Sequence, residues 1–599
     1  MAEKLTNEQQ AAVDSRERSL LVSAAAGSGK TKVLVERLFS YVEREGANLD
    51  DFLIITYTRA AASELRGKIA KALTERMERD PGNYHLRQQM LRVYRADIKT
   101  VDAFCTALLR ENCHLLGEDA RGHALRPDFR VLDENEAQVL RERVLARTLD
   151  DFYDCLTTGS TLLADTLGAG RDDSALEDLV LELHAKLQAQ PYEDKWLEAQ
   201  RAFWRAVPDK IENTPYGKIL LNEVRRKARH CKNLLQRAAQ EMCANDALNQ
   251  KYAPAFLDAS YQLEALEGKT AEGWDAARGV TIAFPRLAAV KDSDGGEMKA
   301  RMKSLWDNCK ETVKGFAEIF SASSDEAVED LRTMAPAMLA LIDLTADFSR
   351  RYNEEKRRRN SADFSDQEHE AIRLLIGEDG APTELARIVS ARYREIMVDE
   401  YQDTNEVQNR IFDAISCKGE NLFTVGDVKQ SIYRFRLADP RIFLQHYNTW
   451  PPLEDAEEHD SAKLLLSRNF RSRKEVLDAT NFIFCNILSE EMGELDYGAD
   501  EMLRLGANYV ESSACGAEFH LLDLPTQTGE QRVRASEAEA AFVADYISDM
   551  LTSEFPIQDD KTKELRPVRE EDIVILMRSP STRLLDYRRA LEARPPLRR

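Results

Sequence analysis

Three features that would assign a chain to a broad class of protein are missing from this sequence. Its nine cysteines include no C-x-x-C pair, and an odd, scattered set indicates free thiols instead of a disulfide framework or a metal site. No apolar run approaches the roughly 18 residues that cross a bilayer, so we expect no membrane span. The polar start, Met1–Gln10, lacks the apolar stretch of a signal peptide, and we therefore expect a cytoplasmic protein.

A surplus of basic residues is missing too, because 105 acidic residues outnumber 83 lysines and arginines and give a formal net charge of −22. Taken alone, this charge argues against a nucleic-acid-binding protein. Net charge governs solubility and long-range steering, however, and does not decide what lines a single groove. Basic residues do gather at positions 225–229 and 350–359. We interpret both clusters as solvated helix faces, with DNA contact as the alternative.

The chain of 599 residues is too long for one domain, and at roughly 100–200 residues per domain we expect three or four. Its first part alternates strands and helices. Leu20–Ser23 predicts a strand, apolar residues between Val33 and Val42 share one helical face, Phe52–Thr56 predicts a second strand, and Ala60–Leu73 predicts a second helix. This order is typical of a parallel α/β sheet.

Charged helical stretches with few strand signals follow, so we expect a large helical insertion. Strand signals return at Glu395–Val398 and Leu422–Val425, and after a polar break another α/β segment begins near Leu464 and includes a strand at Ile573–Met577. The predicted fold class is α/β, with a P-loop lobe that the helical insertion interrupts and the start of a second lobe. The predicted domains are residues 1–117 and 361–450 for the first lobe, 118–360 for the insertion, and 451–599 for the second lobe.

A phosphate-binding loop is predicted between the first strand and the first long helix. Residues 24–31 match the P-loop pattern except at the first position, where alanine replaces glycine. Small residues let backbone N–H groups close around a phosphate, and the helix N-terminus that follows favours an anion. The lysine would reach the β- and γ-phosphates of ATP, and the alternative is a small-residue turn with an incidental lysine. The predicted nucleotide-binding residues of the loop are Ala24, Ala25, Ala26, Gly27, Ser28, Gly29, Lys30 and Thr31.

Partner acids for this loop stand at the end of a later strand, where Asp399 and Glu400 follow Val398. We expect Asp399 to bind Mg²⁺ together with the Thr31 hydroxyl, and therefore to belong to the ATP site. Glu400 would act as the general base that activates the attacking water. Alone, these residues could be a strand that ends in an acidic turn. The P-loop favours the catalytic interpretation.

The order of the motifs resembles that of superfamily 1A DNA helicases, the group of the UvrD, Rep, PcrA and RecB motors. Three positions depart from the usual pattern: Arg59 stands in place of Asn, Asp102 in place of His, and Phe470 in place of Tyr. The resemblance implies two RecA-like lobes, ATP and Mg²⁺ as ligands, DNA as the substrate, and movement along DNA from 3′ to 5′. Besides the P-loop, the segments that carry it are residues 5–10, 56–65, 98–105, 399–404, 426–436 and 469–472.

The resemblance also assigns roles to residues outside the P-loop. Gln9 would read the adenine edge, and Phe470 would stack on adenine. Gln430 would couple the γ-phosphate to DNA contacts, and Arg471 would be an arginine finger, so both count as catalytic. Plain structural roles are the alternatives: a capping box for Gln9, a core aromatic for Phe435, and a surface ion pair for Arg471. The expected DNA contacts are Thr58, Arg59, Thr100, Phe104, Phe435 and Arg436.

Finer features resemble the AddA type of helicase/nuclease. Residues 363–369 and 425–436, together with the large helical insertion, carry this resemblance. It implies the motor of a helicase–nuclease complex that acts in double-strand break repair and recombination. Such a motor would bind single-stranded and duplex DNA, would work beside a second subunit of the AddB type, and would contact no membrane.

Proteins of this type are longer and end in a nuclease domain. No separate cluster of acids with a lysine follows residue 472, so we expect no nuclease activity from this chain. The ending, residues 593–599, suggests truncation within the second lobe. We therefore expect a chain that binds ATP, hydrolyses it poorly because its arginine finger is loosely held, and aggregates through an open sheet edge.

Three other functions remain open on the sequence alone. One is another repair helicase of the UvrD or PcrA type. Another is a different P-loop enzyme such as a nucleotide kinase, although a kinase has no use for the segments at residues 426–436 and 469–472. The third is a truncated module that binds ATP and DNA with little turnover. ATP hydrolysis with and without DNA would separate them.

Overall fold

The structure, a computed structural model, describes residues 4–118, 121–167, 174–416, 419–434, 437–510, 516–524, 534–559 and 562–594. The chain divides into two compact units. The first combines Met1–Leu116 with Asp366–Arg599, and the second is Gly117–Ser365. The first unit is mixed α/β and the second is almost entirely helical, as the change from strand signals to charged helical stretches predicts.

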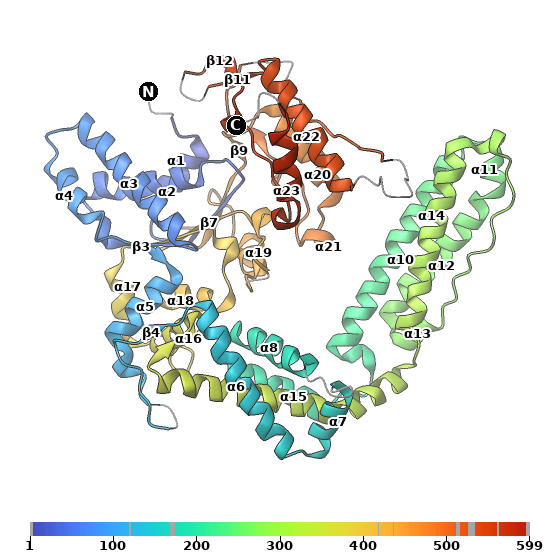
Figure 1. Ribbon diagram of the computed structural model, residues 1–599, viewed down its shortest axis with the longest axis horizontal. Coiled ribbons are helices and arrows are strands. Elements are labelled where there is room, and N and C mark those ends of the chain that lie inside the picture. The colour runs from blue at the N-terminus through green and yellow to red at the C-terminus, as the bar shows by residue number, and fades with distance from the viewer. Residues whose placement is uncertain are drawn as a thin grey trace. The chain divides into compact units, whose positions relative to one another are not determined.

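A six-stranded parallel sheet forms the centre of the first unit (Figure 1). Its strands lie in the order β3–β2–β6–β7–β1–β8, and every neighbouring pair is parallel. Three of them, β1, β2 and β7, are buried along their whole length, which is typical of parallel strands between layers of helices. The strands are β1 (Leu20–Ala24), β2 (Phe52–Thr56), β3 (Asp97–Thr100), β6 (Glu395–Asp399), β7 (Leu422–Gly426) and β8 (Ala462–Leu466).

The helices of this unit bury the apolar faces that their sequences predict. In α2 (Lys30–Glu45), every apolar residue from Val33 to Val42 is buried. These residues join one core with α1 (Asn7–Asp14), α3 (Arg59–Arg79) and the strands. The other helices here are α4 (Tyr84–Arg92), α5 (Val101–Asn112), α16 (Phe364–Leu375), α17 (Glu384–Arg392), α18 (Glu406–Ile415) and α19 (Pro440–Thr449).

The sheet extends beyond residue 450, where the sequence places the end of the first lobe. Strand β8 pairs along its whole length with β1, from Leu20 opposite Ala462 to Ala24 opposite Leu466. The apolar run near Leu464 is therefore the edge strand of the first sheet and does not begin a second one. A short strand carries no local signal of which sheet it joins, because pairing depends on distant residues.

The rest of the first unit contains α/β elements that do not join the central sheet. The strand expected at Ile573–Met577 is wrong, because these residues form no strand, and the Val574 and Leu576 side chains are 76% and 90% exposed. The elements are β9 (Arg468–Asn469) paired in parallel with β10 (Arg504–Leu505), β11 (Pro556–Gln558) paired antiparallel with β12 (Leu565–Pro567), and the helices α20 (Lys474–Ile487), α21 (Glu490–Gly493), α22 (Ala535–Thr552) and α23 (Pro580–Glu592).

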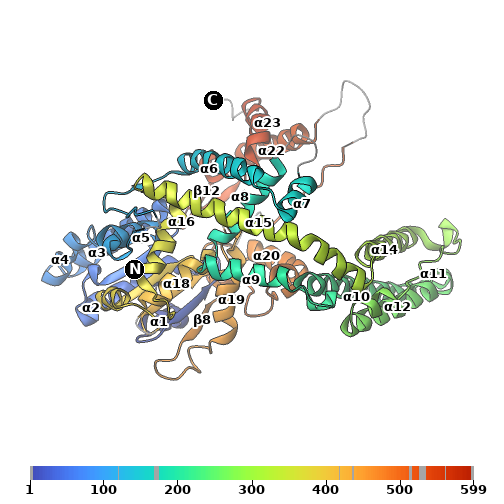
Figure 2. The same cartoon turned by 90° about the horizontal axis from the view of Figure 1, so that it is seen from below.

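The second unit consists of two groups of helices. The long helix α15 (Ser324–Arg358) packs against α6, α7, α8 and α9, and α10 packs against α12 and α14 (Figure 2). The helices before α15 are α6 (Glu134–Asp154), α7 (Thr158–Leu167), α8 (Ser174–Gln188), α9 (Glu193–Arg205), α10 (Pro215–Met242), α11 (Asp246–Lys251), α12 (Ala253–Glu272), α13 (Trp274–Arg278) and α14 (Asp292–Ile319). In the described residues, no helix is long and apolar enough to cross a membrane.

The two ends of the second unit lie side by side. Strand β4 (Arg130–Val131) pairs in parallel with β5 (Ser361–Ala362), and the backbone N–H of Arg126 donates to Asn360 Oδ1 over 2.9 Å. Adjacent ends allow a compact unit to interrupt another without separating the two halves of the host.

The basic clusters of this unit are paired with acids from the same or neighbouring helices. Arg226 and Lys227 pair with Glu223, and Arg229 pairs with Glu267. In the second cluster, the arginines at 350, 351, 358 and 359 also pair with aspartates or glutamates. Such pairs are the usual pattern of a solvated helix face, as the sequence suggested.

Candidate nucleotide-binding site

The parallel sheet brings four loops of the first unit to one edge. Because β1, β6, β7 and β8 run in the same direction, their carboxyl ends meet there. The loops that leave these strands are residues 25–29, 400–405, 427–431 and 467–472. In open α/β sheets, ligands bind outside the carboxyl ends of the strands. All nucleotide and catalytic residues that the sequence predicts, apart from Gln9 on α1, lie in or beside these four loops.

The P-loop is shaped by two glycines and held by the neighbouring strand. Gly27 and Gly29 have φ of 69° and 85°, a left-handed conformation that glycine adopts without a steric penalty. Gly29 is the residue before α2, so Lys30 and Thr31 form the first turn of that helix. The Ala25 N–H donates to the carbonyl of Leu466 on β8 over 2.9 Å. The loop therefore presents backbone N–H groups at a helix N-terminus, which suits a phosphate.

Lys30 contacts the predicted general base directly. Its Nζ lies 2.7 Å from Glu400 Oε2, and Gln402 Nε2 donates to the same oxygen over 2.9 Å. Glu400 has a left-handed backbone with φ of 54°, which is uncommon for a residue with a side chain and occurs often at functional sites. The residue pair is separated by 370 positions in the sequence, and the sheet brings its two members together.

The residues expected to hold Mg²⁺ are next to this pair. Thr31 follows Lys30 and Asp399 precedes Glu400. Burial, and then the Glu400 carboxylate, raise the pKa of Asp399 to about 6, and one buried oxygen of Asp403, Oδ1, accepts no hydrogen bond. Mg²⁺ prefers oxygen ligands and usually combines one or two carboxylates with substrate phosphates, so this donor set fits it. Within the described ranges, no three His, Cys, Asp or Glu side chains form a metal site on their own.

A cavity of about 180 Å³ beside the P-loop contains the two residues expected to contact adenine, Gln9 and Phe470. Gln9 Nε2 donates to the Ser28 carbonyl over 2.9 Å, and its Oε1 accepts from the Thr6 N–H over 3.0 Å. The capping box suggested by the sequence is therefore present, and the same side chain also faces the cavity. The Phe470 ring is 37% exposed. The remaining lining residues are Thr6, Glu8, Ser28, Leu465, Leu466, Ser467, Arg468, Asp500 and Arg504.

Gln430 reaches the Lys30–Glu400 pair through hydrogen bonds. Its Nε2 donates to Asp427 Oδ2 over 2.7 Å, and the Asp427 N–H donates to Gln402 Oε1 over 2.9 Å. Gln402 in turn contacts Glu400. The close approach is tight, because a Cβ at Gly426 would lie 2.4 Å from Gln402 Oε1. A continuous polar path therefore joins the loop after β7 to the catalytic pair, and Gln402 is a member that the sequence analysis did not identify.

Two further residues of this path were also missed. Lys429 Nζ lies 2.9 Å from Asp427 Oδ1 and 2.5 Å from Glu501 Oε2, and the Tyr447 hydroxyl donates to Glu501 Oε1 over 2.6 Å. Glu501 adjoins Asp500, which lines the cavity. The segment 425–436 contains Lys429, but its partner lies 72 positions away, so no local pattern could predict the contact.

The segment 469–472 lies directly against the P-loop. Asn469 Nδ2 donates to the Ala26 carbonyl over 2.7 Å, and the Phe470 N–H donates to the Gly27 carbonyl over 2.8 Å. Asn469 Oδ1 accepts from the N–H groups of Arg471 and Ser472 over 2.8 and 2.7 Å. The Arg471 residue is exposed. Asn469 therefore fixes the backbone from which Arg471 extends beside the phosphate loop.

Replacing Gly27 with alanine is expected to disturb this contact and weaken nucleotide binding. An added Cβ would lie 2.7 Å from Asn469 Nδ2 and 2.9 Å from Arg471 Cβ, and the left-handed backbone would add about 1–2 kcal/mol of strain. Gly46→Ala is the matched control, since φ is 68° there and nothing lies within 4 Å of its Cβ. Thermal melting should show a stability loss in both variants, whereas titration with ATP should show weaker binding for Gly27→Ala alone. Equal ATP affinity in the two variants would contradict the contact's role.

The expected DNA-binding residues fall into three groups. Thr58 and Arg59 are exposed at the start of α3, where Thr58 Oγ1 caps the helix by accepting from the Ala61 N–H. Thr100 caps α5 in the same way and is buried. Phe104 is only 4% exposed, so it is a core residue and its assignment to DNA contact is corrected: one turn of α5 places it on the face that packs inward. Phe435 and Arg436 lie outside the described residues.

Comparison with known proteins agrees with the motif order. The family described as "UvrD/REP helicase N-terminal domain" matches residues 5–451. Among characterised relatives, the AddA subunit of the ATP-dependent helicase/nuclease from Ruminiclostridium cellulolyticum is 34% identical across 96% of this chain and 49% of its own length. The proteins of the same name from Acetivibrio thermocellus and Alkaliphilus oremlandii are 34% and 35% identical across 96% of this chain and 49% and 47% of theirs.

The chain thus spans about half the length of the relatives it matches. The family match covers most of the chain, including the P-loop, the acids after β6 and the loop after β7. The resemblance drawn from the motifs is confirmed, and the chain belongs to the UvrD/REP helicase family.

Proposed function

We propose that this chain is the ATP-driven motor portion of a DNA helicase and corresponds to the N-terminal half of an AddA-type helicase/nuclease. In this proposal the central sheet is the first RecA-like lobe, the second unit is a helical insertion into it, and the residues after β8 begin a second RecA-like lobe. The contact of Lys30 with Glu400 at the P-loop, 2.7 Å, carries the proposal, because it places a phosphate-binding cation and a base in one site.

The chemistry follows from the residues at this edge of the sheet. The N–H groups of residues 25–31 would cradle the phosphates, and Lys30 would neutralise the β- and γ-phosphates. Glu400 would take a proton from the attacking water. Mg²⁺, held by Thr31 and Asp399, would offset charge on the phosphates when bound.

Coupling to DNA would use the contacts on either side of the P-loop. Arg471 would stabilise charge on the transferred phosphoryl group, and Asn469 holds its backbone beside the loop. Gln430 is joined to Glu400 through Asp427 and Gln402, so a change at the γ-phosphate would reach the segment 426–436. Thr58 and Arg59, both exposed, would contact a DNA strand.

The names of the relatives suggest the setting. They are helicase/nuclease subunits, so we propose that the protein acts on single-stranded and duplex DNA in double-strand break repair and recombination, in the cytoplasm, beside a second subunit of the AddB type. Movement from 3′ to 5′ is proposed on the family resemblance.

ATP hydrolysis by the purified chain, measured with and without single-stranded DNA, tests the function. We expect Mg²⁺-dependent turnover that DNA raises, because strand binding and hydrolysis share the path through Gln430. Turnover that is indifferent to DNA would favour another P-loop enzyme, and nucleotide binding without turnover in either condition would favour a binding module.

A further inference from the structure

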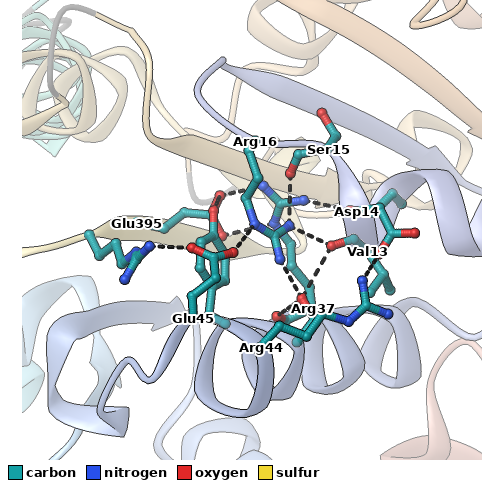
Figure 3. A network of polar contacts seen from close by, with 12 residues as sticks. Val13, Asp14, Ser15, Arg16, Arg37, Arg44, Glu45 and Glu395 are labelled. Atoms are coloured by element: carbon teal, nitrogen blue, oxygen red, sulfur yellow. Dashed lines mark hydrogen bonds and ion pairs between the residues drawn. The ribbon is translucent and has the colours of Figure 1, made fainter.

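A fully buried ion pair lies beneath the nucleotide site. The side chains of Arg37 on α2 and Glu395 at the start of β6 are 0% and 2% exposed. Arg37 Nε donates to Glu395 Oε2 over 2.8 Å, Nη2 donates to Oε1, and the Tyr41 hydroxyl donates to Oε1 over 3.0 Å. Figure 3 shows the guanidinium at the centre of this network. The paired geometry matters here, because a buried charge that loses its partner is strongly unfavourable.

The same guanidinium also holds the end of α1. Arg37 Nη1 donates to the carbonyl of Ala12 over 2.6 Å, one of the last four carbonyls of that helix, which have no partner within it. The guanidinium lies 4.6 Å from the ring centre of Phe423 on β7. A residue of α2 therefore uses three nitrogens to bind α1 and β6 and rests on β7.

These three elements carry the groups that meet the nucleotide. Helix α1 carries Gln9, one turn before Ala12, and Gln9 holds the P-loop carbonyl of Ser28 and lines the cavity. Helix α2 begins with Lys30 two turns before Arg37, and β6 ends at Asp399. Strand β6 is fixed by backbone pairing on both sides, to β2 and β7. Helices α1 and α2 have no backbone pairing to it, so side chains must set their positions.

Other polar links between α1 and α2 lie at the surface. Arg44 Nη1 pairs with Asp14 Oδ1 over 2.7 Å, with side chains 60% and 43% exposed, and exposed pairs contribute little because water and salt screen them. Arg37 has no such screening. Its planar fork fits two acceptors at fixed angles, which a flexible lysine cannot reproduce.

We propose that Arg37 is a positioning residue that fixes α1 and α2 on strand β6, and that through α1 it sets how strongly the base of the nucleotide is bound. This inference rests on the proposed function, since it assumes that Gln9 and the cavity receive the base. It assigns the buried pair a specific effect: weakening the link to Ala12 should reduce recognition of the base more than recognition of the phosphates.

The test compares ATP with inorganic tripolyphosphate, which lacks a base, as competitors of a fluorescent nucleotide in the presence of Mg²⁺. The measured quantity is the ratio of the two affinities in the whole chain. Arg37→Lys keeps a cation for Glu395 but loses the fork that also reaches Ala12. We expect the ratio to fall about tenfold, the scale of one lost charge-assisted hydrogen bond. Arg44→Lys, two turns along the same helix, should leave the ratio unchanged.

Thermal melting of each variant separates positioning from loss of fold. If Arg37→Lys does not fold, the double variant Arg37→Met, Glu395→Leu replaces it, because exchanging both members of a buried ion pair for apolar residues is often tolerated. That variant should fold and should show the same reduced ratio. An unchanged ratio in a folded variant, or an equal loss of affinity for both ligands, would overturn the inference. A wild-type chain that binds no ATP would instead count against the proposed function.

Discussion

Replacing Lys30 with alanine is expected to abolish measurable ATP turnover. The Nζ lies 2.7 Å from Glu400 Oε2, and the residue opens α2 directly after the P-loop, where the backbone N–H groups converge. Its loss would remove the charge that meets the β- and γ-phosphates. Losing one preorganised charge contact of this kind costs roughly 10²–10³-fold in rate. Steady-state phosphate release, with DNA present, measures the effect.

The same substitution also changes the ground state of the site. Without Lys30, Glu400 keeps Gln402 as its partner but loses its neighbouring cation, so nucleotide binding should weaken as well. Lys71→Ala, on an exposed position of α3, is the control and should behave as the wild type. Turnover in Lys30→Ala that stays within twofold of this control would mean that residues 24–31 do not bind the phosphates of the hydrolysed nucleotide.

Features that depend on neighbouring residues were predictable from the sequence. The spacing of apolar residues from Val33 to Val42 indicated the buried face of α2, because a helix repeats over the few residues that the pattern samples. The P-loop was equally local, since one strand, one turn and one helix start form it. The capping box of Thr6 and Gln9 is local as well. These parts of the site could be named from the residues alone.

Features that depend on distant partners were not predictable. The apolar run near Leu464 joined β1, more than 400 residues away in the chain, and the apolar run at Ile573–Met577 formed no strand. Phe104 was expected at a DNA surface and is buried. Glu395 reads as the first residue of an apolar strand, and only the fold shows that it faces Arg37, 358 positions earlier. Pairing and burial are properties of the assembled core, which a single window of sequence does not contain.

Replacing Glu400 with glutamine is expected to separate binding from chemistry. The amide oxygen can still accept from Lys30 and from Gln402, whose present distances to Glu400 are 2.7 and 2.9 Å, so the geometry of the site should persist. The amide cannot take a proton from water, and losing a general base costs about 10²–10⁴-fold in rate. We therefore expect ATP hydrolysis to fall by at least about 10²-fold while ATP affinity is retained.

The electrostatics of the site sharpen this expectation. The Glu400 carboxylate contributes to the raised pKa of Asp399, which is about 6, after burial as the larger cause. A neutral glutamine would remove that repulsion and lower the Asp399 pKa, so the carboxylate would be more fully ionised at neutral pH and Mg²⁺ should bind at least as tightly as in the wild type. The measurements are ATP and Mg²⁺ titrations alongside single-turnover hydrolysis, with Glu406→Gln, exposed at the start of α18, as the matched control. Hydrolysis at the control rate would show that another group activates the water, and a loss of ATP affinity equal to the loss of rate would show that Glu400 holds the nucleotide instead of the water.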